Sequence, residues 1–206
     1  MADTRISFDS IFELADSLEI LQRLHRTGFV MSGVSEPQTI AAHTFGVALW
    51  TLLLLERMPD KTSLDTAKML RMAILHETAE ARIGDIPMPA RRYLNGELIS
   101  QAEKEAVQDM FADFPGDWRL VWEEFEEAQS REARIVKAAD KLELMHKILA
   151  YEHSHNGEFE RFWENDNNFR WAGISEAKEI FEEMKRRHAE GRGQRHQASN
   201  EPIPEP

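Results

Sequence analysis

The chain has 206 residues, of which 42% are hydrophobic and 30% are charged, and this composition is typical of a single globular domain. The formal net charge of −12 argues against long nucleic acid as a partner, because its phosphates require a surface rich in Lys and Arg. The absence of cysteine excludes disulfides, a thiolate metal site and a cysteine nucleophile, so any metal must bind to imidazole and carboxylate groups.

The N-terminus and the apolar runs bear on where the protein is found. The start of the chain lacks the basic and then apolar pattern of a secretory signal. The longest apolar run, residues 48–55, is far short of the ~18 residues that a membrane span requires. We therefore expect a cytoplasmic protein with no membrane partner.

Hydrophobic periodicity predicts two helices at the start of the chain. Apolar residues recur at spacings of three and four over residues 10–24, the pattern of one helix face, and Gly28 ends this helix. Pro37 is well placed as a first helical residue, and residues 40–57 are predicted to form a second, largely buried helix. His43 lies in the early turns of this second helix.

A pattern that resembles a capping box, Thr62 followed three residues later by Asp65, predicts the start of a third helix. The apolar periodicity continues to about residue 81. This helix carries three ionisable side chains of interest, His76, Glu77 and Glu80.

The next part of the chain is also predicted to be helical. After an irregular segment at residues 84–89, which contains one Gly and two Pro, residues 97–114 can form a helix. Residues 118–152 are periodic and are interpreted as two helices that meet near Ser130. Asp140 lies in the second of these two helices.

The end of the chain differs in character from the rest. A last amphipathic helix is predicted over residues 175–187, and the polar, Pro-containing segment 189–206 is predicted to be disordered. Strand alternation, internal repeats and a linker between domains are not seen in the sequence. We therefore predict an all-α protein, with one compact helical domain over residues 1–188 followed by the disordered tail.

The most informative segment is residues 70–87, where an otherwise apolar helix face presents His76, Glu77 and Glu80. Burying charge without a partner is costly, and a divalent metal ion is one partner that would remove this cost. Neutral imidazole and carboxylate together suit Mn, Fe, Co, Ni or Zn. The adjacent pair His76 and Glu77 is a weak signal alone, because a hydrogen-bonded pair on the helix surface is an equally good interpretation.

His43 and Asp140 lie in similar settings, each with apolar flanks on a separate predicted helix. Taken alone, His43 is better interpreted as a core histidine with satisfied hydrogen bonds. Asp140 can equally be a buried salt-bridge partner of Lys137 or Lys141. Together with the pair on the third helix, however, the two residues make a plausible site with four metal ligands.

Four segments resemble blocks of the HD-domain metal-dependent phosphohydrolases, in which a histidine, a His-acid pair and an aspartate follow in this order. They are LHRTGF (24–29), EPQTIAAHTFGVAL (36–49), HETAEARIGDIP (76–87) and REARIVKAADKLELMHKILAYE (131–152). The segments resemble the corresponding blocks of the 5′-deoxynucleotidase subgroup over roughly residues 10–185, and the last block is the most specific part of the resemblance. It implies a single-domain helical bundle of the HD type that hydrolyses (deoxy)nucleoside 5′-monophosphates to nucleoside and phosphate.

The resemblance places the metal ligands at His43, His76, Glu77 and Asp140. It implies one divalent ion per chain, with Mn, Co, Fe, Ni or Zn favoured over Mg. Glu77 departs from the family pattern, in which the second residue of the pair is aspartate. The additional methylene can move the ion outward or change how the carboxylate binds it, so the substitution bears on metal preference and rate.

The resemblance also implies three residues beside the metal. Arg26 matches the arginine that contacts phosphate, and Asp85 matches a second acid of the pocket. Glu80 matches a carboxylate that positions a water or passes a proton, and it is expected to face the same cavity as His76 because residues four apart share a helix face. The implied mechanism is attack of an activated water on a phosphoryl group whose developing charge Arg26 offsets.

The same resemblance implies a small nucleotide as substrate and a homodimer, and nucleoside triphosphates or signalling nucleotides are alternative substrates. Two other functional classes match parts of the sequence. HETAE superficially resembles the H-E-x-x-H helix of metallopeptidases, but Glu80 stands where the second histidine belongs and His43 and Asp140 would be unused. The chain can also be a catalytically silent helical regulatory or binding protein, in which the metal site is structural or lost because of Glu77.

Overall fold

The computed structural model of the chain describes residues 5–154 and 156–198. The described residues form helices joined by loops, and the single β-bridge among them, between His25 and Thr39, belongs to no strand. The α-helices are α1 (Phe8–Glu19), α2 (Thr27–Val30), α3 (Ile40–Leu55), α4 (Thr66–Leu75), α5 (Glu80–Ile83), α6 (Met88–Arg91), α7 (Gly96–Met110), α8 (Gly116–Glu127), α9 (Arg131–His153), α10 (Glu160–Trp163) and α11 (Ser175–Ala198), and the 3₁₀ helices are η1 (Ile20–Gln22), η2 (Lys61–Ser63) and η3 (Asp166–Phe169). The all-α prediction is therefore confirmed.

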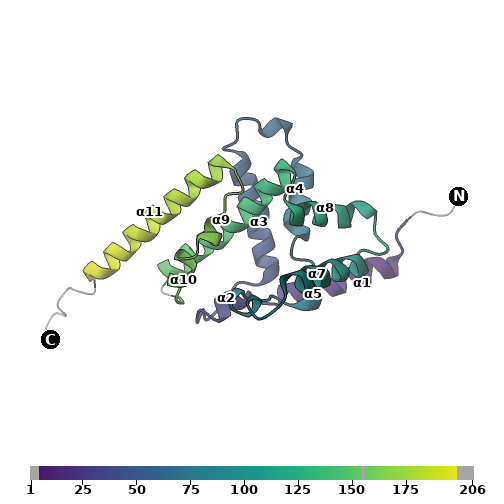
Figure 1. Cartoon of the computed structure of the whole chain (residues 1–206), viewed down its shortest axis with the longest axis horizontal. Coiled ribbons are helices and arrows are strands. Elements are labelled where there is room, and N and C mark those ends of the chain that lie inside the picture. The colour runs from purple at the N-terminus through teal and green to yellow at the C-terminus, as the bar shows by residue number, and fades with distance from the viewer. Residues whose placement is uncertain (1–4, 155, 199–206) are drawn as a thin grey trace.

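Helices α3, α4 and α9 form the centre of the bundle (Figure 1). α3 packs against α9 and α4, and α9 also packs against α8 and α11. Val47 of α3, Met69 and Met72 of α4, and Leu142 and Met145 of α9 have no exposed surface. Each such side chain contributes roughly 1.5–3 kcal/mol by leaving water, so this centre is a rigid support for residues that project from it. α11 and the pair α1 and α7 lie at opposite ends of the molecule (Figure 1).

α3 begins at residue 40 as predicted, but Pro37 is not part of the helix. α3 begins at Ile40, where the Thr39 side chain accepts a hydrogen bond from the backbone N–H of Ala42. The residues before it are held in an extended conformation by pairing with an earlier segment. The backbone N–H of Arg26 donates to the carbonyl of Gln38 at 2.9 Å, and that of Ile40 donates to the carbonyl of residue 24 at 2.8 Å.

The predicted third helix is shorter than expected at both ends. α4 begins at Thr66 after Asp65, whose side chain accepts from the N–H of Lys68, while Thr62 lies in a 3₁₀ turn. The helix ends at Leu75, and residues 76–79 form a turn before the short α5. The prediction that one continuous helix carries the ionisable residues from 76 to 80 is therefore wrong.

The interruption after α4 has a local and a long-range cause. The Thr78 hydroxyl donates to the carbonyl of Leu75 at 2.6 Å, which satisfies an acceptor that the next turn of helix would otherwise use. The indole N–H of Trp122 on α8 donates to the carbonyl of His76 at 3.2 Å. Both bonds favour a turn over a helix at residues 76–79.

The later helices follow the predictions more closely. α7 spans residues 96–110, where a helix over 97–114 was predicted. The predicted division of residues 118–152 into two helices near Ser130 is confirmed. Ala128 has a positive φ of 52° that ends α8, and the Ser130 hydroxyl accepts from the N–H of Ala133 to begin α9. α11 continues through Ala198 and thus enters the segment expected to be disordered, while residues 199–206 of that segment lie outside the described residues.

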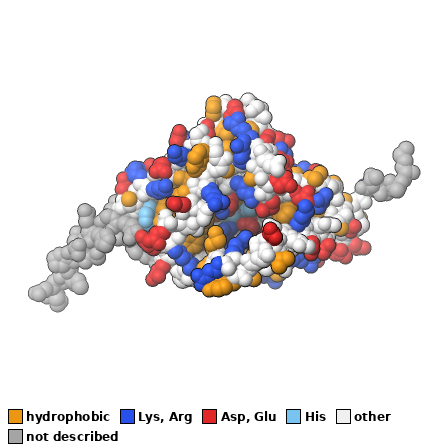
Figure 2. Space-filling model, viewed as in Figure 1, with side chains coloured by type: hydrophobic (Ala, Val, Ile, Leu, Met, Phe, Trp, Pro, Cys, Tyr) orange, Lys and Arg blue, Asp and Glu red, His pale blue; other side chains and the backbone are white. Residues whose placement is uncertain are grey.

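The surface charges and the lengths of the helices are relevant to binding of nucleic acid and to membrane insertion. The face of the molecule seen in Figure 2 carries acidic and basic side chains interspersed with hydrophobic ones. Among the described helices, none combines the length and apolar character needed to cross a membrane.

Candidate metal centre

His43 lies in the first turn of α3 with a fully buried side chain. Its Nδ1 atom is 2.6 Å from Oε2 of Glu143 on α9. A carboxylate oxygen accepts and does not donate, so Nδ1 is the donor in this contact. In the neutral form of the ring, Nε2 then carries a free lone pair.

His76 directly follows α4 and is also buried. Its Nδ1 atom is 2.9 Å from the carbonyl oxygen of Ala73, one turn earlier in the chain. A carbonyl can only accept, so Nδ1 donates here as well and Nε2 is again free to bind a cation. The ring packs against Phe125 of α8, with ring centroids 5.0 Å apart, and this contact fixes its direction.

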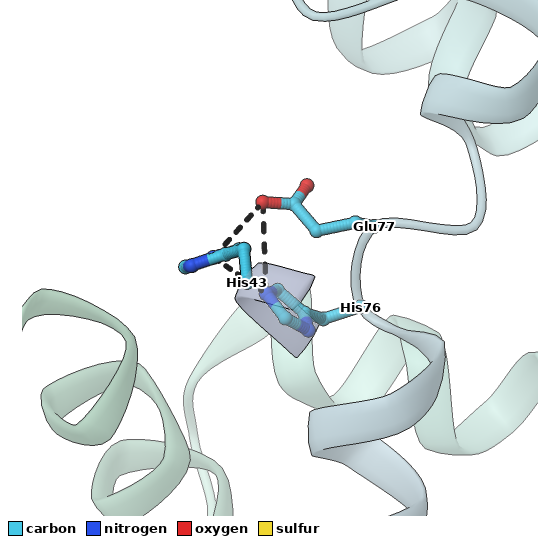
Figure 3. Close-up of side chains that lie close together, drawn as sticks. All are labelled: His43, His76 and Glu77. Atoms are coloured by element: carbon cyan, nitrogen blue, oxygen red, sulfur yellow. Dashed lines mark hydrogen bonds and ion pairs between the residues drawn. The ribbon is translucent and has the colours of Figure 1, made fainter. Parts of the chain in front are cut away.

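The free nitrogens of the two rings point at each other (Figure 3). The Nε2 atoms of His43 and His76 lie 3.4 Å apart, and the ring centroids lie 5.4 Å apart. Two lone pairs at this separation repel each other unless a proton or a metal ion lies between them. The donor set and its tautomers therefore fit a divalent cation, in the arrangement where each metal-binding histidine donates its other N–H to an oxygen.

Glu77 completes a group of three (Figure 3). Its Oε1 atom is 3.5 Å from Nε2 of His43 and 3.6 Å from Nε2 of His76. The three ligand atoms of His43, His76 and Glu77 all lie within 4.8 Å of one another. The turn at residues 76–79 thus directs two successive side chains to one point.

Arg26 approaches the same carboxylate from the N-terminal side of α2. Its guanidinium nitrogen lies 3.4 Å from Oε1 of Glu77, and about a fifth of each side chain is exposed. This arginine therefore lies at the edge of the three-residue group and faces partly toward solvent.

Asp140 is adjacent to the group but lies outside the three-residue set. Its Oδ1 atom is 3.3 Å from Nε2 of His43, whereas its Oδ2 atom is 3.1 Å from Nζ of Lys141. The expected ion pair with Lys141 is therefore confirmed, and the residue also contacts a buried histidine.

The charges of this cluster are strongly coupled. Burial and Arg26 lower the pKa of His43, but hydrogen bonds to Asp140, Glu143 and Glu77 outweigh them and raise it to about 10. Burial raises the pKa of Glu77 and of Asp140, yet the neighbouring histidines and cations bring both values below the usual range. The surrounding carboxylates thus favour a positive charge on the His43 ring.

The two remaining predicted acids lie beside this cluster. Glu80 begins α5, and its Oε2 atom is buried with no hydrogen-bond partner in the described part of the chain. Burial, together with the charges of Glu77 and Asp85, raises the pKa of Glu80 to about 9. Asp85 accepts a hydrogen bond from the N–H of Thr27 at 2.6 Å, so it anchors the segment that carries Arg26.

Glu143 and Gln38 were not expected at the site. Glu143 is buried on α9, and its second oxygen accepts from Nε2 of Gln38 at 2.6 Å. The position of Glu143 three residues after Asp140, between apolar residues, is the one signal in the sequence that could have revealed it. No local pattern marks Gln38, because its contact with α9 spans 105 residues of sequence.

The sequence matches the HD domain family over residues 18–180. This match includes every residue of the cluster. The chain belongs to the HD-domain family. The expected family resemblance is thereby confirmed. His76 and Glu77 form a His-Glu variant of the His-Asp pair after which the family is named.

Several relatives of this HD-domain protein are named for an enzymatic activity. The 5′-deoxynucleotidase hdd1 of Schizosaccharomyces pombe is 26% identical over 170 residues, which cover 80% of this chain and 81% of the relative. The 5′-deoxynucleotidase HDDC2 of Mus musculus is 30% identical over 151 residues, which cover 70% of this chain and 72% of the relative. The expected similarity to 5′-deoxynucleotidases is therefore also confirmed.

Solved structures agree with the fold of this HD-domain protein. A conserved hypothetical protein of Pyrococcus furiosus is 35% identical with a TM-score of 0.71, and the match covers 87% of this chain and 99% of that one. A protein of Pyrococcus horikoshii OT3 is 33% identical with a TM-score of 0.72, over 85% of this chain and 99% of that one.

Proposed function

We propose that this HD-domain protein is a metal-dependent phosphohydrolase that releases phosphate from (deoxy)nucleoside 5′-monophosphates. The observation that carries the proposal is the convergence of His43, His76 and Glu77, with both histidine Nε2 atoms free to bind a cation. The names of the relatives, which are 5′-deoxynucleotidases, support the substrate class.

The proposed cofactor is one divalent ion per chain, held by His43, His76, Glu77 and Asp140. Two imidazoles and two carboxylates favour Mn, Co, Fe, Ni or Zn over Mg. When bound, such an ion lowers the pKa of a bound water and polarises a phosphoryl oxygen. For Asp140 to serve as a ligand, its Oδ1 atom must remain directed at the histidines while Oδ2 keeps its pair with Lys141.

The residues around the proposed metal site have separate roles in this proposal. Arg26 lies at the partly exposed edge of the site and contributes a permanent positive charge and planar donors toward the phosphoryl oxygens of a substrate. Glu80 has a buried oxygen without a partner and a raised pKa, and both properties suit a group that holds or transfers a proton near the reacting phosphate. Asp85 supports this arrangement by fixing Thr27 next to Arg26.

The substrate proposal is tested by a phosphate-release assay on a panel of nucleotides. The purified chain is supplied with Mn, Co or Zn and offered deoxynucleoside monophosphates, ribonucleoside monophosphates, nucleoside triphosphates and cyclic or polyphosphorylated nucleotides. We expect turnover of the monophosphates. Turnover of triphosphates or signalling nucleotides alone would assign another substrate within the family, and metal binding without turnover of any member would support the regulatory interpretation.

A second part of the proposal concerns assembly into a homodimer through α3. This helix contains no Asp, Glu, Lys or Arg in sixteen residues, although part of its surface is exposed. The exposed part is one stripe of side chains with helical spacing, Phe45 (72%), Leu49 (45%), Leu52 (41%) and Leu53 (47%).

An uncharged stripe of this kind needs an apolar partner. The four side chains together expose on the order of 400 Å², about half of the ~800 Å² that each partner buries in a standard interface. A second copy of the chain, related by a twofold axis, offers the same stripe in return.

A further inference from the structure

Glu143 is a buried carboxylate with both oxygens engaged and only 5% of its surface exposed. One oxygen accepts from Nδ1 of His43 at 2.6 Å, and the other accepts from the side-chain amide of Gln38 at 2.6 Å. The carboxylate therefore has its hydrogen bonds on the side of His43 that faces away from His76 and Glu77. It touches none of the atoms where a substrate or an ion would bind, and a direct role in the reaction does not account for it.

We infer that Glu143 is a positioning residue, which fixes the tautomer and the ring direction of His43 so that Nε2 faces the metal site. The inference rests on the proposed function, because it concerns how the chain prepares one ligand for a divalent cation. A carboxylate behind a metal-binding imidazole makes the ring a stronger donor, and losing such a partner typically weakens metal binding about ten- to a hundredfold.

The helix that carries His43 is built to admit this carboxylate. Gly46 lies three residues after His43 inside α3, where glycine costs about 1 kcal/mol relative to alanine. A Cβ atom at this position would lie 2.7 Å from both Cγ and Oε1 of Glu143. Only glycine therefore lets α9 bring the carboxylate this close to α3, which explains a residue that is otherwise unfavourable in a helix.

The backbone of Gln38, whose side-chain amide holds the second oxygen, is fixed from two directions. The backbone N–H of Gln38 donates to the hydroxyl of Tyr151 on α9 at 2.8 Å, and its carbonyl accepts from the N–H of Arg26 at 2.9 Å. The side-chain oxygen of Gln38 is buried and has no partner within the described residues. Gln38 thus gives up one hydrogen bond of its own while donating to Glu143, as expected for an amide whose direction the carboxylate determines.

An ion pair that only stabilises the fold is the competing explanation, and the two differ in what they predict for metal binding. The test compares Glu143→Gln, which keeps the size of the side chain and removes its charge, with Glu132→Gln. Glu132 lies on the same helix, is largely buried, and bonds to the N–H of Asp65 away from the site. The two readouts are Zn²⁺ affinity, by competition with a chromophoric chelator, and the ¹⁵N NMR spectrum of the histidine rings in Zn²⁺-loaded protein.

We expect Glu143→Gln to bind Zn²⁺ about ten- to a hundredfold more weakly than the wild type, and we expect the His43 ring of the Zn²⁺-loaded wild type to carry its proton on Nδ1. Glu132→Gln should keep both properties. Wild-type Zn²⁺ affinity in Glu143→Gln would overturn the inference. So would a spectrum of the Zn²⁺-loaded wild type that places the His43 proton on Nε2, and this measurement needs no variant to fold.

A second variant moves the carboxylate without changing any charge. Gly46→Ala should displace Glu143 and weaken Zn²⁺ binding at least about tenfold, even though alanine favours the helix. Gly96→Ala is the matched control, because a Cβ atom at Gly96 meets no other atom within 4 Å. Unaltered Zn²⁺ affinity in Gly46→Ala would count against the inference.

These measurements separate the inference from the proposed function. Failure of the wild type to bind a divalent ion, or binding without phosphate release, would be a failure of the proposed function. Zn²⁺ binding by the wild type, with equal binding by Glu143→Gln and Gly46→Ala, would be a failure of the inference alone.

Discussion

The Nε2 atoms of His43 and His76 lie 3.4 Å apart, and the other nitrogen of each ring already donates to an oxygen. The two hydrogen bonds fix both tautomers, so the facing atoms are two acceptors that only a proton or a metal ion can bring together. The packing of α3 against α4 brings these two atoms together and so creates the proposed metal site.

Replacing one of the two rings should abolish metal binding. We expect the Zn²⁺ affinity of His76→Ala to fall more than about a hundredfold, and phosphate release to be lost with it. This loss exceeds the one expected from removing a hydrogen-bond partner of a metal-binding histidine. His146→Ala is the control, since His146 packs against Trp50 and is not part of the cluster. Metal content by elemental analysis checks the result, and an unchanged stoichiometry in His76→Ala would contradict it.

The variant carboxylate at position 77 should be adapted to its own site. Shortening it in Glu77→Asp removes one methylene and withdraws the carboxylate from both histidines and from Arg26, which lie 3.4 to 3.6 Å away. Because metal sites tolerate displacements of only about 0.5 Å, we expect metal affinity to fall by about tenfold. Competition titrations with Mn, Co and Zn measure these affinities. Tighter metal binding by Glu77→Asp than by the wild type would show that the cavity is not shaped for glutamate.

Glu80 should matter for turnover and not for metal binding. Replacing a general acid or base typically costs about 10²- to 10⁴-fold in rate, and we expect a decrease of kcat in this range for Glu80→Gln at unchanged metal content. Glu182→Gln, which alters an exposed pair with Lys185 on α11, should keep full activity. A decrease in metal content that parallels the decrease in kcat would instead make Glu80 part of the metal site.

Stability of the metal-free protein should depend on pH through His43. Its pKa in the folded chain is raised from 6.5 to about 10, so its contribution is complete below about pH 6.5 and is lost as the pH rises through about 10. The raised pKa of Glu80 acts in the same direction, starting from its ordinary value of 4.5. The groups that face His43 are Arg26, His76, Glu77, Asp140 and Glu143.

We therefore expect the free energy of unfolding of chelator-treated protein to fall by up to a few kcal/mol between pH 7 and pH 10. With saturating Zn²⁺, which replaces the proton on His43, the decrease should be smaller. Denaturant titrations of the Glu80→Gln variant isolate the histidine contribution. A metal-free protein that becomes more stable over this range would contradict the assignment.

The α3 stripe should control assembly. We expect a dimer in light scattering for the wild type and a monomer for Leu49→Asp, because a buried unpaired carboxylate in the middle of the interface is costly. Leu98→Asp introduces the same charge at an exposed position on α7 and should leave the dimer intact. A dimer that survives Leu49→Asp would exclude this face.

Much of the fold could be predicted from the sequence because helix ends are encoded locally. Ser130 caps α9 with its own hydroxyl, so its role is visible in the sequence. The start of α3 and the break after α4 are set by partners that are distant along the chain, namely the residue 24–26 segment and the indole of Trp122. Local periodicity cannot register such contacts, so Pro37 was wrongly expected to be helical and the break after α4 was missed.

The candidate site was predicted in part for the same reason. His43, His76 and Glu77 stand out as ionisable residues among apolar ones, and the structure brings them together. The placement of Glu80 on the same helix face as His76 was wrong, because a turn separates α4 from α5. Glu143 is one of four acidic residues on α9, and its importance is not visible until its contact with α3 is known.

The most direct test of the central claim is phosphate release as a function of bound metal. Chelator-treated protein is titrated with Zn²⁺, Mn²⁺ or Co²⁺ in the presence of a deoxynucleoside monophosphate, and bound metal is measured in parallel. The proposed function predicts no phosphate release before titration and a linear rise that saturates at one ion per chain. Release that does not depend on the metal, or full metal occupancy without release, would contradict it.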